Sequence, residues 1–176
     1  MMVANAITLI RLGLFAVFLN VAVKVGIGSA WPWFALSWAL DAIDGTIARG
    51  LHEESRFGFL LDKVVDRITL VGTGIFLLWS HDASPWVVLL FTKDILLLPA
   101  LVIHWVQHSL IQSAGYFGKL TTFLQGGSLI WILIGWPFVA GVIAVVAAVG
   151  FWTAVLYWQQ FFAVSEKLDM KKQEAV

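Results

Sequence analysis

The 176-residue chain contains no cysteine, only four prolines and few charged residues. Without cysteine it can form neither a disulfide nor a thiolate metal site, and it has no thiol nucleophile. Any metal must therefore be held by oxygen ligands or by histidines. Charged residues make up 12% of the chain, against about a quarter in a soluble domain, while hydrophobic residues make up 60% and mean hydropathy is +0.89. These values are typical of a protein that crosses a membrane several times.

Acidic and basic residues balance at 11 each, so net charge favours no acidic or basic partner. The chain has no basic patch interleaved with aromatic residues on a polar face, and no nucleic-acid partner is expected. The N-terminus has neither a basic leader nor a small-residue cleavage site. We therefore interpret the first apolar run as a retained membrane span and not as a signal peptide.

Six apolar segments approach the roughly 20 residues that a membrane-spanning helix needs. They are residues 7–22, 30–49, 57–80, 85–106, 120–136 and 138–162. Residues 120–165 contain no Asp, Glu, Lys or Arg and are too many for one span, so we expect a turn at Gly135-Trp136-Pro137. The sequence predicts an all-α polytopic membrane protein with six transmembrane helices. Residues 1–176 are expected to form one domain, with a polar tail from about residue 164 to residue 176.

The basic residues predict the orientation of these six helices. If the helices alternate in direction, one side of the membrane receives only Lys24, and the other side receives Arg49, Arg56, Lys63, Arg67, Lys119, Lys167, Lys171 and Lys172. The positive-inside rule makes the crowded side cytoplasmic, so both termini are expected there. An aromatic belt at the outer interface would be formed by Trp31, Trp33, Trp79, Trp86 and Trp136.

Four aspartates lie at the predicted cytoplasmic ends of two of these helices, in the stretch DAIDGTIARGLHEESRFGFLLDKVVDRI, residues 41–68. Asp41 and Asp44 are three residues apart and share one helix face, and Asp62 and Asp66, four apart, share a face of the next helix. The two helices run in opposite directions, so the pairs can face each other at similar depth. Asp41 precedes Arg49 by about 12 Å of helix, which places the carboxylates below the headgroups.

Charged groups at this depth are costly and usually line a bundle interior or a water-filled cavity. Four facing carboxylates would repel one another unless cations neutralise them, and all-oxygen ligation suits Mg²⁺, Mn²⁺ or Ca²⁺. The alternative is that the aspartates pair with nearby basic residues, for which Arg49, Arg56, Lys63 and Arg67 are available. Pairing explains one intramembrane aspartate as well as a metal does, but it explains four on two facing helices less well.

Small residues and an arginine accompany the carboxylates. Gly45 directly follows Asp44, and Ala48 comes one turn later, so a bulky polar group could approach the helix closely there. The alternative is tight helix packing, because small residues also line interfaces between membrane helices. Arg49 ends this face with a planar donor fork suited to phosphate. Together these residues suggest a substrate that contains a diphosphate.

The spacing D-x-x-D-G-x-x-A-R, eight residues, G-x-x-x-D-x-x-x-D, from Asp41 to Asp66, resembles the signature of the CDP-alcohol phosphotransferases, also called CDP-alcohol phosphatidyltransferases. All eight specified positions are filled. The resemblance implies that two divalent ions, Mg²⁺ or Mn²⁺, are held by Asp41, Asp44, Asp62 and Asp66. It further implies that Asp66 is the general base, that an acceptor hydroxyl attacks the phosphorus of CDP-diacylglycerol next to the lipid alcohol, and that CMP leaves.

The same resemblance assigns roles to the residues between the aspartates. Gly45, Ala48 and Gly58 would make room for the cytidine nucleotide, and Arg49 would contact a phosphate. It also implies a homodimer in a bacterial inner (plasma) membrane, with the active site at the cytoplasmic face. Asn5, Thr8 and Arg11 resemble the polar start of the first helix in relatives and could approach the nucleotide.

Two weaker resemblances concern the acceptor. GKLTTFLQ, residues 118–125, and Lys93-Asp94 are similar to segments of the phosphatidylglycerophosphate synthase branch, which implies that Lys93 and Lys119 bind a phosphate on the acceptor. Glycerol 3-phosphate is therefore the preferred acceptor, and inositol, inositol phosphate, serine and phosphatidylglycerol stay open because Lys63 replaces a proline of that branch. Alternatively, Lys119 anchors the chain at the interface and Lys93 forms a salt bridge.

Two other functions could also use acidic residues in a membrane. Prenyl transfer also uses aspartates and Mg²⁺ on a diphosphate, but those proteins have more helices and two separate aspartate-rich motifs. A divalent-cation carrier would spread its acids through the membrane depth, whereas most of the acids here lie near one face.

Overall fold

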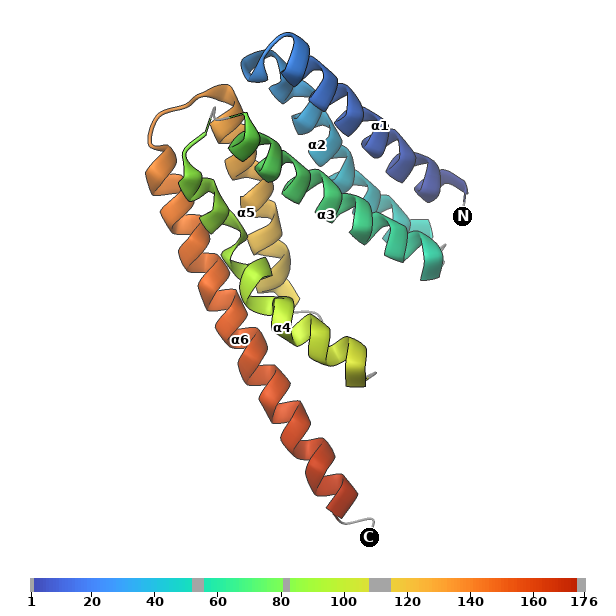
Figure 1. Ribbon diagram of the computed structural model, residues 1–176. Helices are drawn as coiled ribbons and strands as arrows, with labels where there is room; N and C mark the ends of the chain where they lie inside the picture. Colours follow the sequence, from blue (N-terminus) through green and yellow to red (C-terminus); the bar gives the residue numbers. More distant parts are fainter. Residues whose placement is uncertain (1, 52–55, 81–82, 108–114, 174–176) are drawn as a thin grey trace. The chain divides into compact units, whose positions relative to one another are not determined.

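In the part of the chain that the structure, a computed structural model, describes, every regular element is a helix. That part covers residues 2–51, 56–80, 83–107 and 115–173, and its side chains are described for residues 7–41, 64–80, 83–99 and 116–163. The elements are α1 (Met2–Lys24), α2 (Ile27–Leu51), α3 (Arg56–Trp79), the 3₁₀ helix η1 (Pro85–Phe91), α4 (Thr92–Gln107), α5 (Gly115–Ile134) and α6 (Val139–Gln173) (Figure 1). The predicted all-α fold is confirmed.

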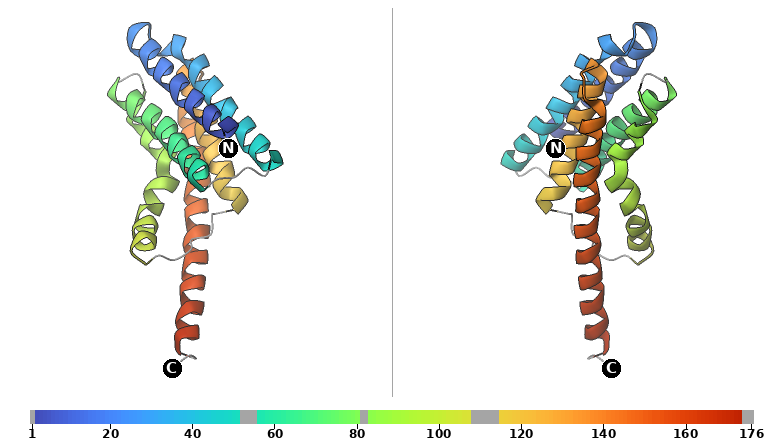
Figure 2. Two further views of the ribbon diagram at one scale, coloured as in Figure 1. Left: turned by 90° about the vertical axis from the view of Figure 1, so that its right-hand side faces the viewer. Right: turned by 90° about the vertical axis from the view of Figure 1, so that its left-hand side faces the viewer.

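Three stretches of the described residues are long and apolar enough to cross a membrane, namely Ile7–Lys24, Tyr116–Ile134 and Val139–Ala163. Each coincides with one of the six predicted spans. The chain is thus a membrane protein with at least these candidate spans, while the full set of six and the orientation of the termini stay predictions. The polar tail continues α6 as helix up to Gln173, and Figure 2 shows α6 as one continuous helix.

The fourth predicted span differs from the others because it begins as a 3₁₀ helix and becomes α-helical only at Thr92. Pro85 suits the first position of a helix because its missing N–H would have no partner there anyway. A 3₁₀ helix has three residues per turn, so side chains three apart lie on one face. Val87 and Leu90 are both fully buried on such a face, and Lys93, three residues further, is 3% exposed. The lysine therefore continues the inward-facing stripe that η1 begins.

The chain divides into two compact units. One comprises Met1–Pro85 and Gly126–Val139, and the other comprises Trp86–Gln125 and Ala140–Val176. Helix α5 contributes its first half to the second unit and its last turns to the first.

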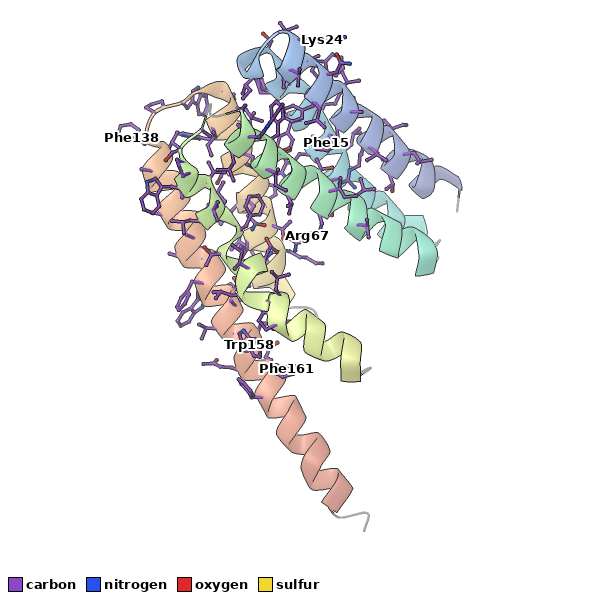
Figure 3. All side chains as sticks on the ribbon, in the orientation of Figure 1. Phe15, Lys24, Arg67, Phe138, Trp158 and Phe161 are labelled. Atoms are coloured by element: carbon purple, nitrogen blue, oxygen red, sulfur yellow. The ribbon has the colours of Figure 1, made fainter. Side chains whose placement is uncertain are left out.

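The first unit is built around aromatic rings between α1, α2 and α3, which lie side by side in Figure 1. Phe18 is fully buried, and its ring centroid lies 5.9 Å from that of Phe15, 5.7 Å from that of Phe34 and 6.0 Å from that of Phe76. A Cβ at Gly72 of α3 would lie 2.8 Å from the Phe15 ring, which is labelled in Figure 3. The glycine thus lets α3 approach α1 closely.

The last part of α5 joins this unit against α2. A Cβ at Gly126 would overlap the indole nitrogen of Trp38 and lie 2.6 Å from its Cδ1 atom, whereas a Cβ at Gly127 would meet nothing within 4 Å. Helix α5 then ends in the predicted turn, where Gly135 and Phe138 have positive φ angles of 76° and 64°. The Trp131 indole N–H donates to the Pro137 carbonyl at 2.8 Å and ties the turn to the helix.

The second unit packs α6 against α4 and the first half of α5. A Cβ at Gly150 of α6 would lie 3.3 Å from the Lys93 backbone nitrogen, so these two helices approach closely at that level. Further along α6, the Trp158 indole N–H donates to the Leu96 carbonyl of α4 at 3.2 Å. Trp158 and its neighbour Phe161 are labelled in Figure 3, and their ring centroids are 5.6 Å apart.

The two neighbouring glycines of α5 provide a matched test of this packing. We expect Gly126→Ala to lower the thermal unfolding midpoint by several degrees, because overpacking against a buried ring costs about 1–3 kcal/mol. We expect Gly127→Ala to leave the midpoint unchanged or to raise it slightly, because alanine has the better helix propensity. Thermal unfolding of both variants in detergent micelles measures the difference. Equal midpoints would show that α5 does not rest on Trp38.

Candidate active site

Two of the four motif aspartates meet at one arginine in the first unit. Arg11 of α1 donates from Nη1 to Asp41 Oδ1 of α2 at 2.8 Å, and from Nη2 to Asp66 Oδ1 of α3. One guanidinium group therefore connects three helices. The carboxylates lie far apart in the sequence, and the shared arginine brings them to one place.

The burial of the three groups is unequal. The Arg11 side chain is 2% exposed, while those of Asp41 and Asp66 are 32% and 25% exposed. The guanidinium group is thus the buried part of the cluster, and the two carboxylates are its more exposed part. The Ser37 hydroxyl donates to the Arg11 backbone carbonyl at 3.2 Å, so α2 also fixes the backbone of α1 at this residue. An arginine stays protonated in proteins, which makes the charge permanent.

The other motif residues can be placed only by their helices. Asp44, Gly45, Ala48 and Arg49 belong to α2, and Gly58 and Asp62 belong to α3, but their side chains lie outside the described residues. Within the side chains that are described, no three acidic or histidine residues gather into a metal-binding group. The predicted roles of all these residues stay predictions.

The described part of the cluster offers ligand atoms that fit a divalent ion. Asp41 and Asp66 offer only oxygen ligands, which Mg²⁺ and Mn²⁺ prefer. A carboxylate has two oxygens with about four lone-pair positions, so the bond from one Oδ1 atom to Arg11 does not exhaust it. Both side chains also keep a quarter or more of their surface exposed. A cation could therefore reach these carboxylates.

Sequence reasoning did not foresee that Arg11 of α1 pairs with these aspartates. It named four basic residues near the motif as possible partners. The side chains of three of them lie outside the described residues, and the fourth, Arg67, is exposed on α3 and labelled in Figure 3. The resemblance to relatives indicated only that Arg11 could approach the nucleotide, and that role stays a prediction. The sequence did contain a signal for this pairing, since Arg11 lies inside an apolar run. A charged residue in such a run usually has an oppositely charged partner elsewhere in the bundle.

The second unit contains a separate cluster of buried polar groups around Lys93. The Lys93 ammonium group donates to the Thr122 hydroxyl at 2.8 Å and to the Gly118 carbonyl at 3.3 Å, both on α5. The fully buried Gln125 amide donates to the Leu90 carbonyl and to Asp94 Oδ2, each at 2.8 Å. These bonds hold α4 against α5 with groups that the membrane interior would otherwise leave unsatisfied.

The cluster extends from α5 to α6. The hydroxyl groups of Thr121 and Thr153 are 2.8 Å apart, and both residues are fully buried. Each hydroxyl also lies 2.8 Å from the backbone carbonyl one turn earlier in its own helix. Within the described part of the chain, Gln125 Oε1 is buried without a hydrogen-bond donor.

The two lysines predicted to bind the acceptor differ in their surroundings. Lys93 is buried and bonded to α5, while Lys119 is exposed at the start of α5. The Gly118 carbonyl that accepts from Lys93 belongs to the residue before Lys119, so both lysines lie at the same end of α5. Their role in acceptor binding stays a prediction.

The fold and the cluster describe an all-helical membrane protein that holds motif carboxylates against one arginine. The chain matches the CDP-alcohol phosphatidyltransferase family over residues 1–159 and belongs to that family. The aspartate signature lies wholly within the matched region.

Curated relatives fall into two branches. A Mycobacterium tuberculosis protein named as a phosphatidylglycerophosphate synthase is 33% identical over 158 residues, which cover 83% of this chain and 74% of that protein. A Mycobacterium bovis protein named as a cardiolipin synthase is 36% identical over 124 residues, which cover 69% of this chain and 59% of that protein. The matched region thus spans less than two thirds of the cardiolipin synthase relative.

The hydrogen bond between Lys93 and Thr122 can be tested by removing one hydroxyl group. We expect Thr122→Val to destabilise the protein by about 1.5–3 kcal/mol, because a hydrogen bond to a charged group contributes that much. Thr92→Val is the matched control, since the exposed Thr92 hydroxyl donates only to the Leu89 carbonyl of the preceding turn. Thermal unfolding in detergent compares the two. A Thr122→Val protein as stable as the control would mean that this bond does not hold α4 to α5.

Proposed function

We propose that the chain is an integral-membrane enzyme that transfers a phosphatidyl group from CDP-diacylglycerol to a small alcohol and releases CMP. The preferred acceptor is glycerol 3-phosphate. The observation that carries the proposal is the complete aspartate signature on two helices, of which Asp41 and Asp66 share one buried partner. Family membership supports the reaction class.

In this proposal Asp41, Asp44, Asp62 and Asp66 hold two divalent ions, Mg²⁺ or Mn²⁺. When bound, such ions neutralise the diphosphate and stabilise the attacking and leaving oxygens of an in-line displacement. The chain's own residues bind and orient the substrate. Gly45, Ala48 and Gly58 leave room for the cytidine nucleotide, and Arg49 contacts a phosphate through its donor fork.

Asp66 is the proposed general base. Its Oδ1 atom accepts a hydrogen bond from Arg11, which leaves Oδ2 as the oxygen that takes the acceptor's hydroxyl proton. The acceptor oxygen then forms a bond to the phosphorus next to the lipid alcohol. The bond from that phosphorus to the bridging oxygen breaks, and its electron pair leaves with CMP. The side chain is 25% exposed, which is consistent with access for an alcohol from water.

The acceptor phosphate is assigned to the start of α5. Lys119 is exposed there and can contact an anion directly, while Lys93 is already bonded to Thr122 and Gly118. In this arrangement Lys119 makes the first contact and Lys93 adds positive charge from the buried side. The positive-inside rule puts this end of α5 at the cytoplasmic face of a bacterial inner membrane, and a homodimer of six-helix subunits is the proposed assembly.

Phosphatidylglycerol is the second candidate acceptor, because the relatives include proteins named as cardiolipin synthases. The two candidates differ in charge and in location. Glycerol 3-phosphate comes from water with a doubly charged phosphate, whereas phosphatidylglycerol is a lipid with a singly charged one. Inositol, inositol phosphate and serine are further alternatives of the same reaction.

The reaction is tested by CMP release from CDP-diacylglycerol by the purified full chain in detergent, with Mg²⁺ or Mn²⁺ and each acceptor in turn. We expect release with glycerol 3-phosphate, and we expect Asp66→Asn to reduce it at least about 100-fold, because an amide cannot act as the base. Asp94→Asn is the control, since an amide oxygen can still accept from Gln125. No release with any acceptor would refute the proposed reaction, and release with phosphatidylglycerol alone would replace the preferred acceptor.

The acceptor site is tested by Lys119→Met. We expect the KM for glycerol 3-phosphate to rise about tenfold with little change in kcat, because one charge-assisted contact of about 1.4 kcal/mol is lost from substrate binding. Lys24→Met, which removes an exposed charge at the far end of α1, should leave KM unchanged. Kinetics at saturating CDP-diacylglycerol measure both. An unchanged KM in Lys119→Met would remove this lysine from the acceptor site.

A further inference from the structure

We propose that Arg11 is a positioning residue of the candidate active site. Its guanidinium group fixes the carboxylates of Asp41 and Asp66 relative to each other, so that the pair is prepared to receive a divalent ion. The inference rests on the proposed function in one respect, since it takes these two aspartates as metal ligands. It adds a residue from α1 that lies outside the aspartate signature.

The first support is the geometry of the contact. Arg11 uses one terminal nitrogen for each carboxylate, Nη1 for Asp41 and Nη2 for Asp66. A guanidinium group is planar and rigid, so the two accepting oxygens are held at a separation that the fork dictates. A lysine ammonium has no such fork, and its three donors rotate freely about a flexible stem. Only arginine can therefore set both the distance and the relative orientation.

The second support is how the arginine itself is held. Its side chain is 2% exposed, and the Ser37 hydroxyl of α2 donates to its backbone carbonyl. Thr8, one turn earlier on α1, is also buried at 2% exposure. The polar face of α1 thus points into the unit and not toward lipid, so the guanidinium has little freedom to leave the carboxylates.

The third support is the charge that remains. Two carboxylates and one guanidinium group carry a net charge of −1, so the trio still attracts a cation. The carboxylates are the more exposed members of the trio, so an ion can reach them more easily than it can reach the guanidinium group. Groups that hydrogen-bond to metal-ligating carboxylates commonly orient them, and their loss weakens metal binding by about 10- to 100-fold.

Two other roles for Arg11 make different predictions. If the arginine only compensated negative charge, any cation at this position would serve, and Arg11→Lys would bind metal like the unmodified chain. If it occupied the place of the metal and had to be displaced, Arg11→Met would bind metal more tightly. A positioning role predicts weaker binding in both variants, because neither retains the fork.

The test measures Mn²⁺ binding to the purified full chain in detergent by electron paramagnetic resonance of the free ion, without substrate. The variants are Arg11→Lys and Arg11→Met, and Lys24→Met serves as a control that removes one exposed charge from the same helix. We expect Arg11→Lys and Arg11→Met to raise the Kd for Mn²⁺ by about 10- to 100-fold, and the control to change it less than twofold. A Kd unchanged in Arg11→Lys, or lowered in Arg11→Met, would overturn the proposal.

Further measurements establish that the variants are folded and that the bound Mn²⁺ occupies the proposed site. Circular dichroism and size-exclusion chromatography establish that each variant is folded, and Arg11→Lys decides the question if Arg11→Met does not fold. Asp41→Asn and Asp66→Asn should abolish the tight Mn²⁺ site, and tight binding that survives both would overturn the proposal. If the unmodified chain binds Mn²⁺ but releases no CMP with any acceptor, the proposed function fails while the role of Arg11 is still decided by the two Kd values.

Discussion

One buried guanidinium group connects three helices of the first unit through its two ion pairs. The membrane interior offers no water to solvate an isolated charge. Arg11 must therefore stay paired with its carboxylate partners. Those partners lie on α2 and α3, and the rotation of α1 about its own axis is thereby fixed. The aromatic contacts of Phe18 then follow, because it lies two turns further along the same inward face.

The second unit meets the same physical problem with almost no ionic pairing in the contacts described. Hydrogen bonds to neutral groups carry most of the contacts there, as between Thr121 and Thr153. The buried Lys93 ammonium group is likewise satisfied by a hydroxyl and a carbonyl group of α5. A buried polar group is tolerated when it is hydrogen-bonded, so this unit can be closely packed, with α6 against the backbone of α4 at Gly150. The first unit accepts a costly charge cluster where chemistry is proposed to take place.

Much of the architecture could be predicted because it depends on local pattern. Apolar runs of sufficient length indicated the helices, and Gly135-Trp136-Pro137 indicated the turn where the structure has positive φ angles. Spacing alone placed Asp41 and Asp66 on neighbouring helices. The pairing of these residues with Arg11 could not be predicted in the same way, because it depends on how α1 is rotated against two helices that are distant in the sequence.

The sequence pattern also could not distinguish the 3₁₀ turns of η1 from an α-helix, because residues 85–91 are all apolar and fit either kind of helix. The distinction matters for Lys93, which is buried because Val87 and Leu90 begin a stripe with a repeat of three residues. One residue more or fewer between Pro85 and Lys93 would carry the ammonium group about 100–120° around the helix axis, away from Thr122. Evolution can therefore exchange apolar side chains in this segment far more freely than it can insert or delete a residue.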